Sequence, residues 1–227
     1  MRVVSLVPSS TETLLALGAD VVACTRFCEQ PAIPHVGGTK NPDLDAIVSL
    51  GPDVVVMDRE ENRLEDHDAL VARGVPVHVS DVTSIVDALE LVDELRALTG
   101  SSGTRAAMPE PAVGPRRSAF VPIWRRPWMA IGAGTYGASV LAHVGVDLVT
   151  AEGGRYPVVE LDDVASAAPD LAVIPSEPYD FADHHLEEIR AAMPEARIVR
   201  VDGRDLFWWG IRTPEAVARL LAATAGW

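Results

Sequence analysis

One stretch of the sequence occurs twice, 117 residues apart and without a gap. The segment 44–60 aligns with 161–177, and seven of these seventeen positions are identical, including the Pro-Asp pairs at 52–53 and 169–170. A repeat at one fixed offset indicates two copies of one structural unit. Two similar lobes that face each other leave a cleft, where ligands tend to bind. The repeat therefore predicts a two-lobed chain with a ligand site in an interlobe cleft.

Short apolar runs alternate with helical patterns in both halves, which is typical of βαβ units around a parallel sheet. The first half predicts strands near 2–7, 20–25, 53–57 and 75–79 and helices near 10–18, 42–50 and 62–73. The second half predicts strands near 118–123, 147–150, 170–174 and 197–201 and helices near 135–144, 160–168, 181–192 and 213–224.

Residues typical of helix ends support these boundaries. The run Ser9-Ser10-Thr11-Glu12 fits a capping box, and Asn41-Pro42 fits an N-cap followed by the first helical residue. Three glycines, at 18, 51 and 74, follow the first-half helices at the positions where helices commonly end.

A single amphipathic helix separates the two halves. Apolar side chains at 85, 88, 89, 92 and 95 share one face of the segment 84–98. Fifteen helical residues span about 22 Å, enough to run from one lobe to the other. We predict an α/β protein with two similar three-layer lobes, parallel sheets and one long bridging α-helix. The expected domains are an N-terminal lobe over 1–83, the bridging helix and linker over 84–117, and a C-terminal lobe over 118–227.

Composition limits the possible partners and compartments. The formal net charge of −14 makes nucleic acid and anionic membranes poor partners, and no apolar run is long enough to span a bilayer. A buried-strand pattern begins at Arg2 with no signal sequence before it. We therefore expect a cytoplasmic protein as written, or a periplasmic or other extracytoplasmic one if a leader was removed. Two cysteines are too few for a secreted disulfide framework.

Loops at the carboxyl ends of parallel strands are the expected ligand contacts. These loops hold four of the five tryptophans and several arginines of an otherwise acidic chain, which suits a large, flat or anionic ligand. The predicted ligand-binding residues are Ser9, Arg26, Arg59, Glu60, Trp124, Arg125, Trp128, Glu177, Tyr179, Trp208, Trp209 and Arg212.

Three segments together resemble a known family. They are the opening run 2–14, the segment Val36-Gly37-Gly38-Thr39-Lys40-Asn41-Pro42-Asp43, and the helix that follows Asp81-Val82-Thr83. This combination is similar to the metal-chelate receptors of ABC importers, whose members bind vitamin B12, haem or ferric siderophores. The resemblance implies two α/β lobes joined by one long helix, with aromatic and arginine side chains holding the ligand between them. It also implies that acidic residues dock onto a permease, for which Glu65 and Glu187 or Glu188 are the candidates. Asp58 stands where the B12-binding members have an aromatic residue.

Metal and catalytic sites have weaker support. The histidines lack the spacing of a zinc site, and of the two cysteines only Cys28 is expected in a cleft loop, as a possible soft ligand or reactive thiol. No P-loop, dinucleotide fingerprint or nucleophile elbow is present. A chelatase-like tetrapyrrole enzyme, with His143 and Glu177 as the pair to test, is the enzymatic alternative.

The sequence thus predicts a non-catalytic binding protein with no resident cofactor and no metal site of its own, whose ligand is itself a metal complex. It would bind cobalamin or another corrinoid, haem or a ferric siderophore, either as an importer receptor or as a cytoplasmic carrier. A protein–protein interaction module is the third interpretation, in which the aromatic loops bind another protein.

Overall fold

The computed structural model describes all 227 residues, and the chain divides into two compact units. The first unit holds Met1–Val82, Val86–Ala106 and Trp209–Arg212, and the second holds Thr83–Ile85, Ala107–Trp208 and Thr213–Trp227. This division and the predicted domain ranges differ in three places. Most of the predicted bridging segment groups with the first unit, and so do residues 209–212 from the predicted C-terminal lobe. Thr83, from the predicted N-terminal lobe, groups with the second unit.

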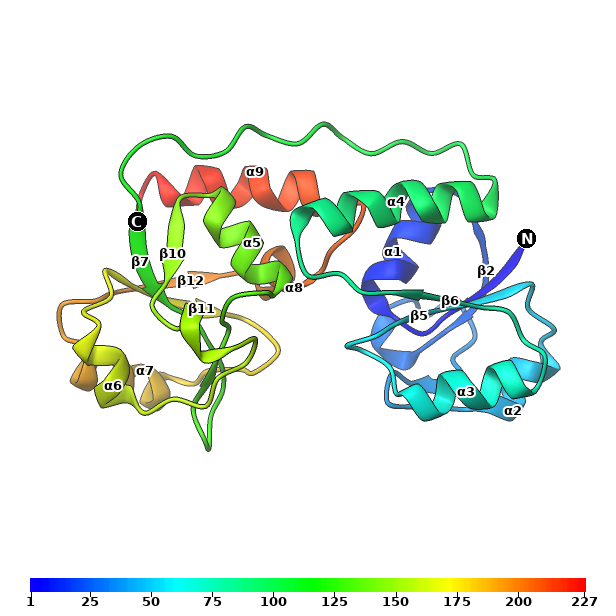
Figure 1. Ribbon diagram of the computed structural model, residues 1–227, viewed down its shortest axis with the longest axis horizontal. Helices are drawn as coiled ribbons and strands as arrows, with labels where there is room; N and C mark the ends of the chain where they lie inside the picture. Colours follow the sequence, from blue (N-terminus) through cyan, green and yellow to red (C-terminus); the bar gives the residue numbers. More distant parts are fainter. The chain divides into compact units, whose positions relative to one another are not determined.

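The first unit has three layers around a four-stranded parallel sheet (Figure 1). Its strands are β1 (Arg2–Ser5), β2 (Asp20–Cys24), β5 (Val54–Asp58) and β6 (Val77–Ser80), in the order β2-β1-β5-β6. Helices α1 (Pro8–Ala16) and α4 (Ile85–Thr99) lie on one face, and α2 (Leu44–Ser49) and α3 (Leu64–Ala72) lie on the other. Every residue of β5 is buried, which explains its run of valines. On the α2–α3 side, Ile47 and Leu70 pack with Val4, Val55 and Met57 of the sheet.

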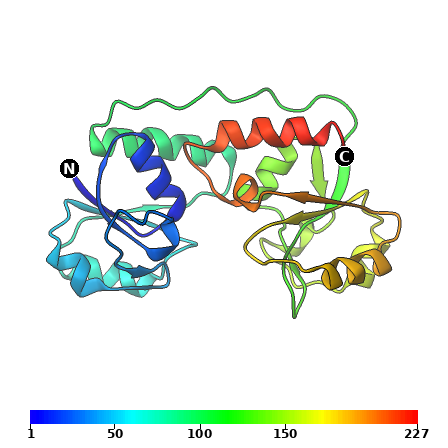
Figure 2. The ribbon, with the colours of Figure 1, turned by 180° about the vertical axis from the view of Figure 1, so that it is seen from behind.

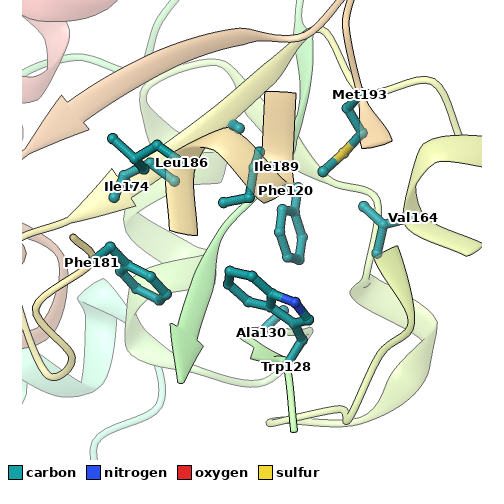
Figure 3. Packing of buried hydrophobic residues seen from close by; sticks show 10 residues of the cluster. Phe120, Trp128, Ala130, Val164, Ile174, Phe181, Leu186, Ile189 and Met193 are labelled. Atoms are coloured by element: carbon teal, nitrogen blue, oxygen red, sulfur yellow. The ribbon is translucent and has the colours of Figure 1, made fainter. Parts of the chain in front are cut away.

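The second unit repeats this plan (Figure 2). Its parallel sheet has the order β10-β7-β11-β12 and consists of β7 (Arg117–Phe120), β10 (Val146–Leu148), β11 (Leu171–Pro175) and β12 (Arg197–Val201). The helices are α5 (Tyr136–His143), α6 (Leu161–Ser166), α7 (Asp183–Ala192), α8 (Gly203–Phe207) and α9 (Thr213–Thr224). One core cluster gathers the rings of Phe120, Trp128 and Phe181 against Leu186 and Ile189 of α7 (Figure 3).

The internal repeat corresponds to equivalent elements of the two units. Shifted by 117 residues, the bounds of α2 become those of α6, and the bounds of β5 become those of β11. Numbered along the chain, the four strands of each parallel sheet also take the same spatial order, 2-1-3-4. The prediction of two similar α/β units with parallel sheets is therefore confirmed.

Two of the predicted helix starts are wrong. Helix α1 begins at Pro8 after Val7, so Ser9 to Glu12 lie inside the helix and form no capping box. Helix α2 begins at Leu44, with the Asp43 carboxylate accepting a hydrogen bond from the Ala46 amide at 3.0 Å. Asn41-Pro42 instead forms β4 (Asn41–Pro42), which pairs antiparallel with β3 (Gly37–Gly38). In both cases another residue nearby also satisfies the rules for a helix start.

Helix ends follow the glycine rule more closely. Gly18, Gly51 and Gly74 have φ of 82°, 56° and 77°, just beyond α1, α2 and α3. The helix predicted over 84–98 is α4, and residues 100–116 after it form a loop without helix or strand. The short elements that complete the chain are η1 (Arg26–Cys28), β8 (Pro122–Trp124), β9 (Met129–Ala130) and η2 (Ala151–Gly153). None of the helices combines the length and the hydropathy that crossing a membrane requires.

Candidate functional site

The predicted ligand residues fall equally into the two units. Ser9, Arg26, Arg59, Glu60, Trp209 and Arg212 belong to the first, and Trp124, Arg125, Trp128, Glu177, Tyr179 and Trp208 belong to the second. Because all strands of each main sheet are parallel, the loops after them gather at one edge of that sheet. We describe the loops of each unit separately.

In the first unit, the loop after β5 is held by the two side chains at its ends. The Asp58 carboxylate accepts hydrogen bonds from the Glu60 amide (2.9 Å), the Glu61 amide (3.3 Å) and the Ser80 hydroxyl (2.8 Å). The Asn62 side chain accepts from the Asp58 amide (2.8 Å) and donates to the carbonyls of Leu6 and Thr39. Burial raises the pKa of Asp58 above its ordinary value, although these hydrogen bonds oppose the shift. Asp58 therefore shapes the loop and does not form its outer wall.

This fixed loop presents Arg59 and Glu60 to solvent. Arg59 Nη1 lies 3.2 Å from Asp81 Oδ2, and its side chain is largely exposed. Lys40 Nζ donates to the Glu60 carbonyl oxygen at 2.6 Å, which leaves the Glu60 carboxylate outside that contact. Arg26, in the one-turn helix η1, stacks its guanidinium 4.7 Å above the ring of exposed Phe27. The first unit thus offers two exposed guanidinium groups and one exposed ring at this edge.

Other predicted residues of the first unit hold the segment Trp209–Arg212 against α1. The Trp209 amide donates to Ser9 Oγ at 3.3 Å, and the Ile211 amide donates to Thr13 Oγ1 at 3.1 Å. Arg212 Nε lies 3.3 Å from Glu12 Oε2. Ser9 and Arg212 are thus engaged within the protein, and Trp209 is only 6% exposed. None of the three presents a free group to a ligand in this structure.

In the second unit, Trp124 is the most exposed of the predicted aromatic residues, at 47%. Its ring meets the edge of Tyr179 with centroids 5.1 Å apart, and Tyr179 in turn contacts Phe181 at 4.9 Å. Trp128 is different: it is 6% exposed and stacks on Phe181 inside the core (Figure 3). The buried rings therefore support Trp124 and Tyr179, which form an aromatic surface at the sheet edge.

Arg125 is committed to contacts within the second unit. Its Nε and Nη2 atoms lie 2.9 and 2.5 Å from Glu188 Oε2, and its guanidinium stacks 4.8 Å from the centroid of the Trp128 ring. Only 19% of its side chain is exposed. Such a paired and stacked arginine fixes the hairpin that carries Trp124, because the ion pair ties this hairpin to α7.

Sequence reasoning missed Arg204, in α8 directly after β12. Its guanidinium lies 5.2 Å from the Trp208 ring centroid, and its Nε is 3.9 Å from Glu177 Oε2. Asp202 fixes the start of this helix by accepting from the Arg204 amide at 2.9 Å. The rule that selected the other strand-end loops would also have selected Arg204. We call Trp124, Tyr179, Glu177, Arg204 and Trp208 the second-unit surface.

The chelatase pair is not supported by the topology of the second unit. His143 ends α5, three residues before β10 begins, and its Nε2 lies 3.0 Å from the Pro109 carbonyl oxygen. Glu177 follows the carboxyl end of β11. Because β10 and β11 belong to one parallel sheet, the two side chains lie at opposite edges of it.

Comparison with known proteins finds similarity over the first unit. The periplasmic binding protein family matches residues 3–111, which include the first-unit sheet except for Arg2, together with its loops. That part of the chain is similar to the periplasmic binding protein family. Vitamin B12-binding proteins of Yersinia pestis (strain Pestoides F) and Yersinia pseudotuberculosis serotype O:1b (strain IP 31758) are 33% identical over 100 residues, 41% of this chain. The match spans 36% of the length of these curated relatives.

The periplasmic binding protein fold extends over the rest of the chain. The periplasmic haem-binding protein HutB of Vibrio cholerae superposes with a TM-score of 0.78 at 20% identity, covering 99% of this chain and 98% of that one. The periplasmic vitamin B12-binding protein BtuF of Vibrio cholerae gives 0.73 at 17% identity, covering 97% and 95%. At these identities the likeness shows the fold alone. The resemblance to metal-chelate receptors that the sequence indicated is confirmed.

Proposed function

We propose that this periplasmic binding protein relative is a non-catalytic receptor for a metal chelate: a corrinoid such as cobalamin, haem, or a ferric siderophore. The names of its relatives and of the similar structures support this ligand class. The observation that carries the proposal is the second-unit surface, where a half-exposed tryptophan is held on buried rings at the carboxyl edge of a parallel sheet.

The chemistry of the second-unit surface suits such ligands. The exposed face of Trp124 offers a flat apolar platform for a macrocycle, and Tyr179 holds that platform in one orientation. Arg204 stands on the Trp208 ring at the same edge, where its guanidinium can pair with carboxylate, phosphate or hydroxamate oxygens. In the first unit, Arg26 and Arg59 offer the same chemistry. The position of the ligand between the two lobes remains a prediction from the sequence.

Trp124 gives the sharpest test. A tryptophan side chain has up to about 250 Å² to bury, and Trp124 exposes 47%, so a ligand could cover about 120 Å² of it. At about 25 cal/mol per Å² this corresponds to roughly 3 kcal/mol, an upper value. Trp124→Ala should therefore weaken binding by about 10- to 100-fold. Val113→Ala is the matched control, because Val113 is fully exposed in the loop 100–116 and should leave affinity unchanged.

The experiment titrates purified protein with cyanocobalamin, haemin and a ferric hydroxamate, following tryptophan fluorescence and thermal unfolding. We expect saturable quenching by one of the three, with about 2.7 kcal/mol of stabilisation at a hundredfold excess over Kd. Quenching and thermal shift absent for all three ligands would refute the proposal. Equal affinity of wild type and Trp124→Ala would remove the second-unit surface from the site.

We further propose that an ABC permease receives the ligand through Glu65 and Glu187. Glu65 lies in the first turn of α3 with 70% of its side chain exposed, although Arg63 Nη1 lies 3.0 Å from it. Glu187 is exposed on α7, whereas Glu188 is occupied by Arg125, which favours Glu187 over its neighbour. Charge reversal at Glu65 and Glu187 should abolish ligand uptake by the transporter and leave ligand affinity unchanged. A cytoplasmic carrier would show no effect of these changes on cellular uptake.

A further inference from the structure

The first unit contains a buried pair of thiols that the proposed receptor function does not use. Cys24 ends β2, and Cys28 ends the single turn of η1 that follows. Both are free, with exposures of 0% and 2%, and the Cys24 thiol is hydrogen-bonded to the Cys28 sulfur. The Cys28 amide donates to the Thr25 carbonyl at 3.1 Å, which turns the chain back toward Cys24. A hydrogen bond between thiols four residues apart indicates that the two sulfurs are near each other, which a disulfide with little backbone movement requires.

The surroundings of Cys28 are polar, although the site is buried. Thr11 Oγ1 and Thr25 Oγ1 each lie 3.2 Å from its sulfur, and Ser5 Oγ lies 2.8 Å from Thr11 Oγ1. These three hydroxyl residues are fully buried. Hydroxyl donors around a sulfur favour its thiolate, because they hydrogen-bond to the charged form.

The two thiols have opposite acid strengths. Hydrogen bonding from Cys24, together with the hydroxyls of Thr11 and Thr25, lowers the pKa of Cys28 to about 6 against the opposing effect of burial. The same hydrogen bond and burial raise the pKa of Cys24. These opposite shifts favour a proton on Cys24 and a thiolate at Cys28.

We propose that Cys24 and Cys28 form a redox-reactive dithiol site that a hydroperoxide closes into an intramolecular disulfide. The Cys28 thiolate attacks the peroxide oxygen, the O–O bond breaks, and protonation of the leaving oxygen gives Cys28 sulfenic acid and either water or an alcohol. The Cys24 sulfur then attacks the Cys28 sulfur. The S–O bond breaks, and the Cys24 proton leaves with the hydroxide as water. Two electrons pass from the two thiols to the peroxide.

Access requires only local motion. Cys28 lies at the end of one helical turn whose other residues, Arg26 and Phe27, are exposed. Opening of so short an element costs less than global unfolding and admits a small peroxide to the sulfur. Closure of the disulfide would then tie this turn covalently to the end of β2.

The sequence provides a direct readout of closure. Arg26 lies between the two cysteines, so trypsin separates them into the peptides 3–26 and 27–40. Native protein is treated with hydrogen peroxide, its remaining thiols are blocked with N-ethylmaleimide in denaturant, and intact mass and tryptic peptides are measured. We expect a monomer lighter by two hydrogen atoms that takes up no maleimide, with the two peptides joined until a reductant is added.

The expected reaction also has a pH and a sequence dependence. Iodoacetamide labelling of Cys28 in native protein should have its midpoint near pH 6, and Thr11→Val with Thr25→Val should raise this midpoint and slow closure several-fold. In Cys24→Ser, the sulfenic acid should persist and react with dimedone. Any of three results would overturn the proposal. Wild-type protein could still take up two maleimides after peroxide treatment, it could form cross-links only between molecules, or its alkylation midpoint could lie near that of an ordinary thiol.

Discussion

The internal repeat places a glycine and an alanine at equivalent positions, and substituting each by the other should change stability in opposite directions. Gly51 follows α2 with φ of 56°, and its equivalent after α6 is Ala168 with φ of 46°. Both amides close the helix in the same way, Gly51 onto the Val48 carbonyl at 3.1 Å and Ala168 onto the Ala165 carbonyl at 2.9 Å. The second unit therefore holds an alanine in the left-handed conformation that the first unit gives to glycine.

The size of the stability change follows from backbone conformation alone, because a methyl group at either position has no packing contacts to gain or lose. A Cβ on Gly51 would meet nothing within 4 Å, and Ala168 is exposed. Left-handed backbone costs an alanine about 1–2 kcal/mol, and the greater freedom of glycine in the unfolded chain returns about 0.4–1 kcal/mol. Ala168→Gly should therefore stabilise the second unit by about 0.5–1 kcal/mol, or ~2 °C in Tm. Gly51→Ala should destabilise the first unit by a similar amount.

Ala167→Gly is the matched control, since Ala167 is also exposed but has φ of −80°. The same chemical change one residue earlier should lower stability by about 0.5–1 kcal/mol. Calorimetry or urea unfolding of the three variants measures the signs. A decrease on Ala168→Gly, or the same sign for Ala167→Gly and Ala168→Gly, would refute the conformational argument.

Two further predictions concern buried titratable groups. The raised pKa of Asp58 means that its ionisation opposes folding, so its stabilising contribution is present below pH 3.8 and is lost as pH rises through the folded pKa. Asp58→Asn should thus equal or exceed wild-type stability at neutral pH but not at low pH, whereas Asp58→Ala should lose about 3 kcal/mol in urea unfolding. Burial is the main cause that lowers the pKa of His185; the neighbouring His184 lowers it further, and Glu188 opposes the shift. His185 therefore contributes stability that is fully present above pH 6.5 and is lost as pH falls through its folded pKa. In His185→Gln the side-chain amide oxygen can still accept a hydrogen bond from the Ala182 backbone amide. This variant should lose less unfolding free energy than wild type between neutral pH and about pH 5, the difference in slope being at most ~1.4 kcal/mol per pH unit. An unchanged pH profile would contradict this.

Much of the fold could be predicted because its signals are local. Strand runs such as the one predicted near 53–57, glycines after helices and the repeat offset each depend on spacing along the chain, and all correspond to observed elements. The errors occurred where neighbouring residues each satisfy a rule for a helix start. For α1, Ser9 fits an N-cap while Pro8 fits the first helical position after Val7; for α2, Asn41 and Asp43 both fit an N-cap. The outcome depends on where the preceding strand or hairpin ends.

The candidate site was less predictable, because a side chain's availability depends on distant partners. No residue near Arg125 in the sequence predicts its ion pair with Glu188, 63 residues away, and no residue near Arg212 predicts its ion pair with Glu12. Trp124 and Trp128 are four residues apart and chemically identical, yet one is half exposed and the other is in the core. Strand-end position selects the loops at one edge of each sheet, but only tertiary packing separates the side chains that are committed to internal contacts from those that are exposed.

The two units diverge where their shared scaffold stops constraining them. At the end of the repeated strand, the first unit has Asp58, which turns inward and fixes a polar loop, while the second has Pro175, followed by the loop that carries Tyr179. Glu60 and Glu177 occupy equivalent positions, but the contact at Glu60 is to its backbone carbonyl, whereas the Glu177 carboxylate faces Arg204. The sheets need buried apolar strands and Pro-Asp turns to fold, so the repeat persists there. The loops have no such shared demand, and they have become polar in the first unit and aromatic in the second.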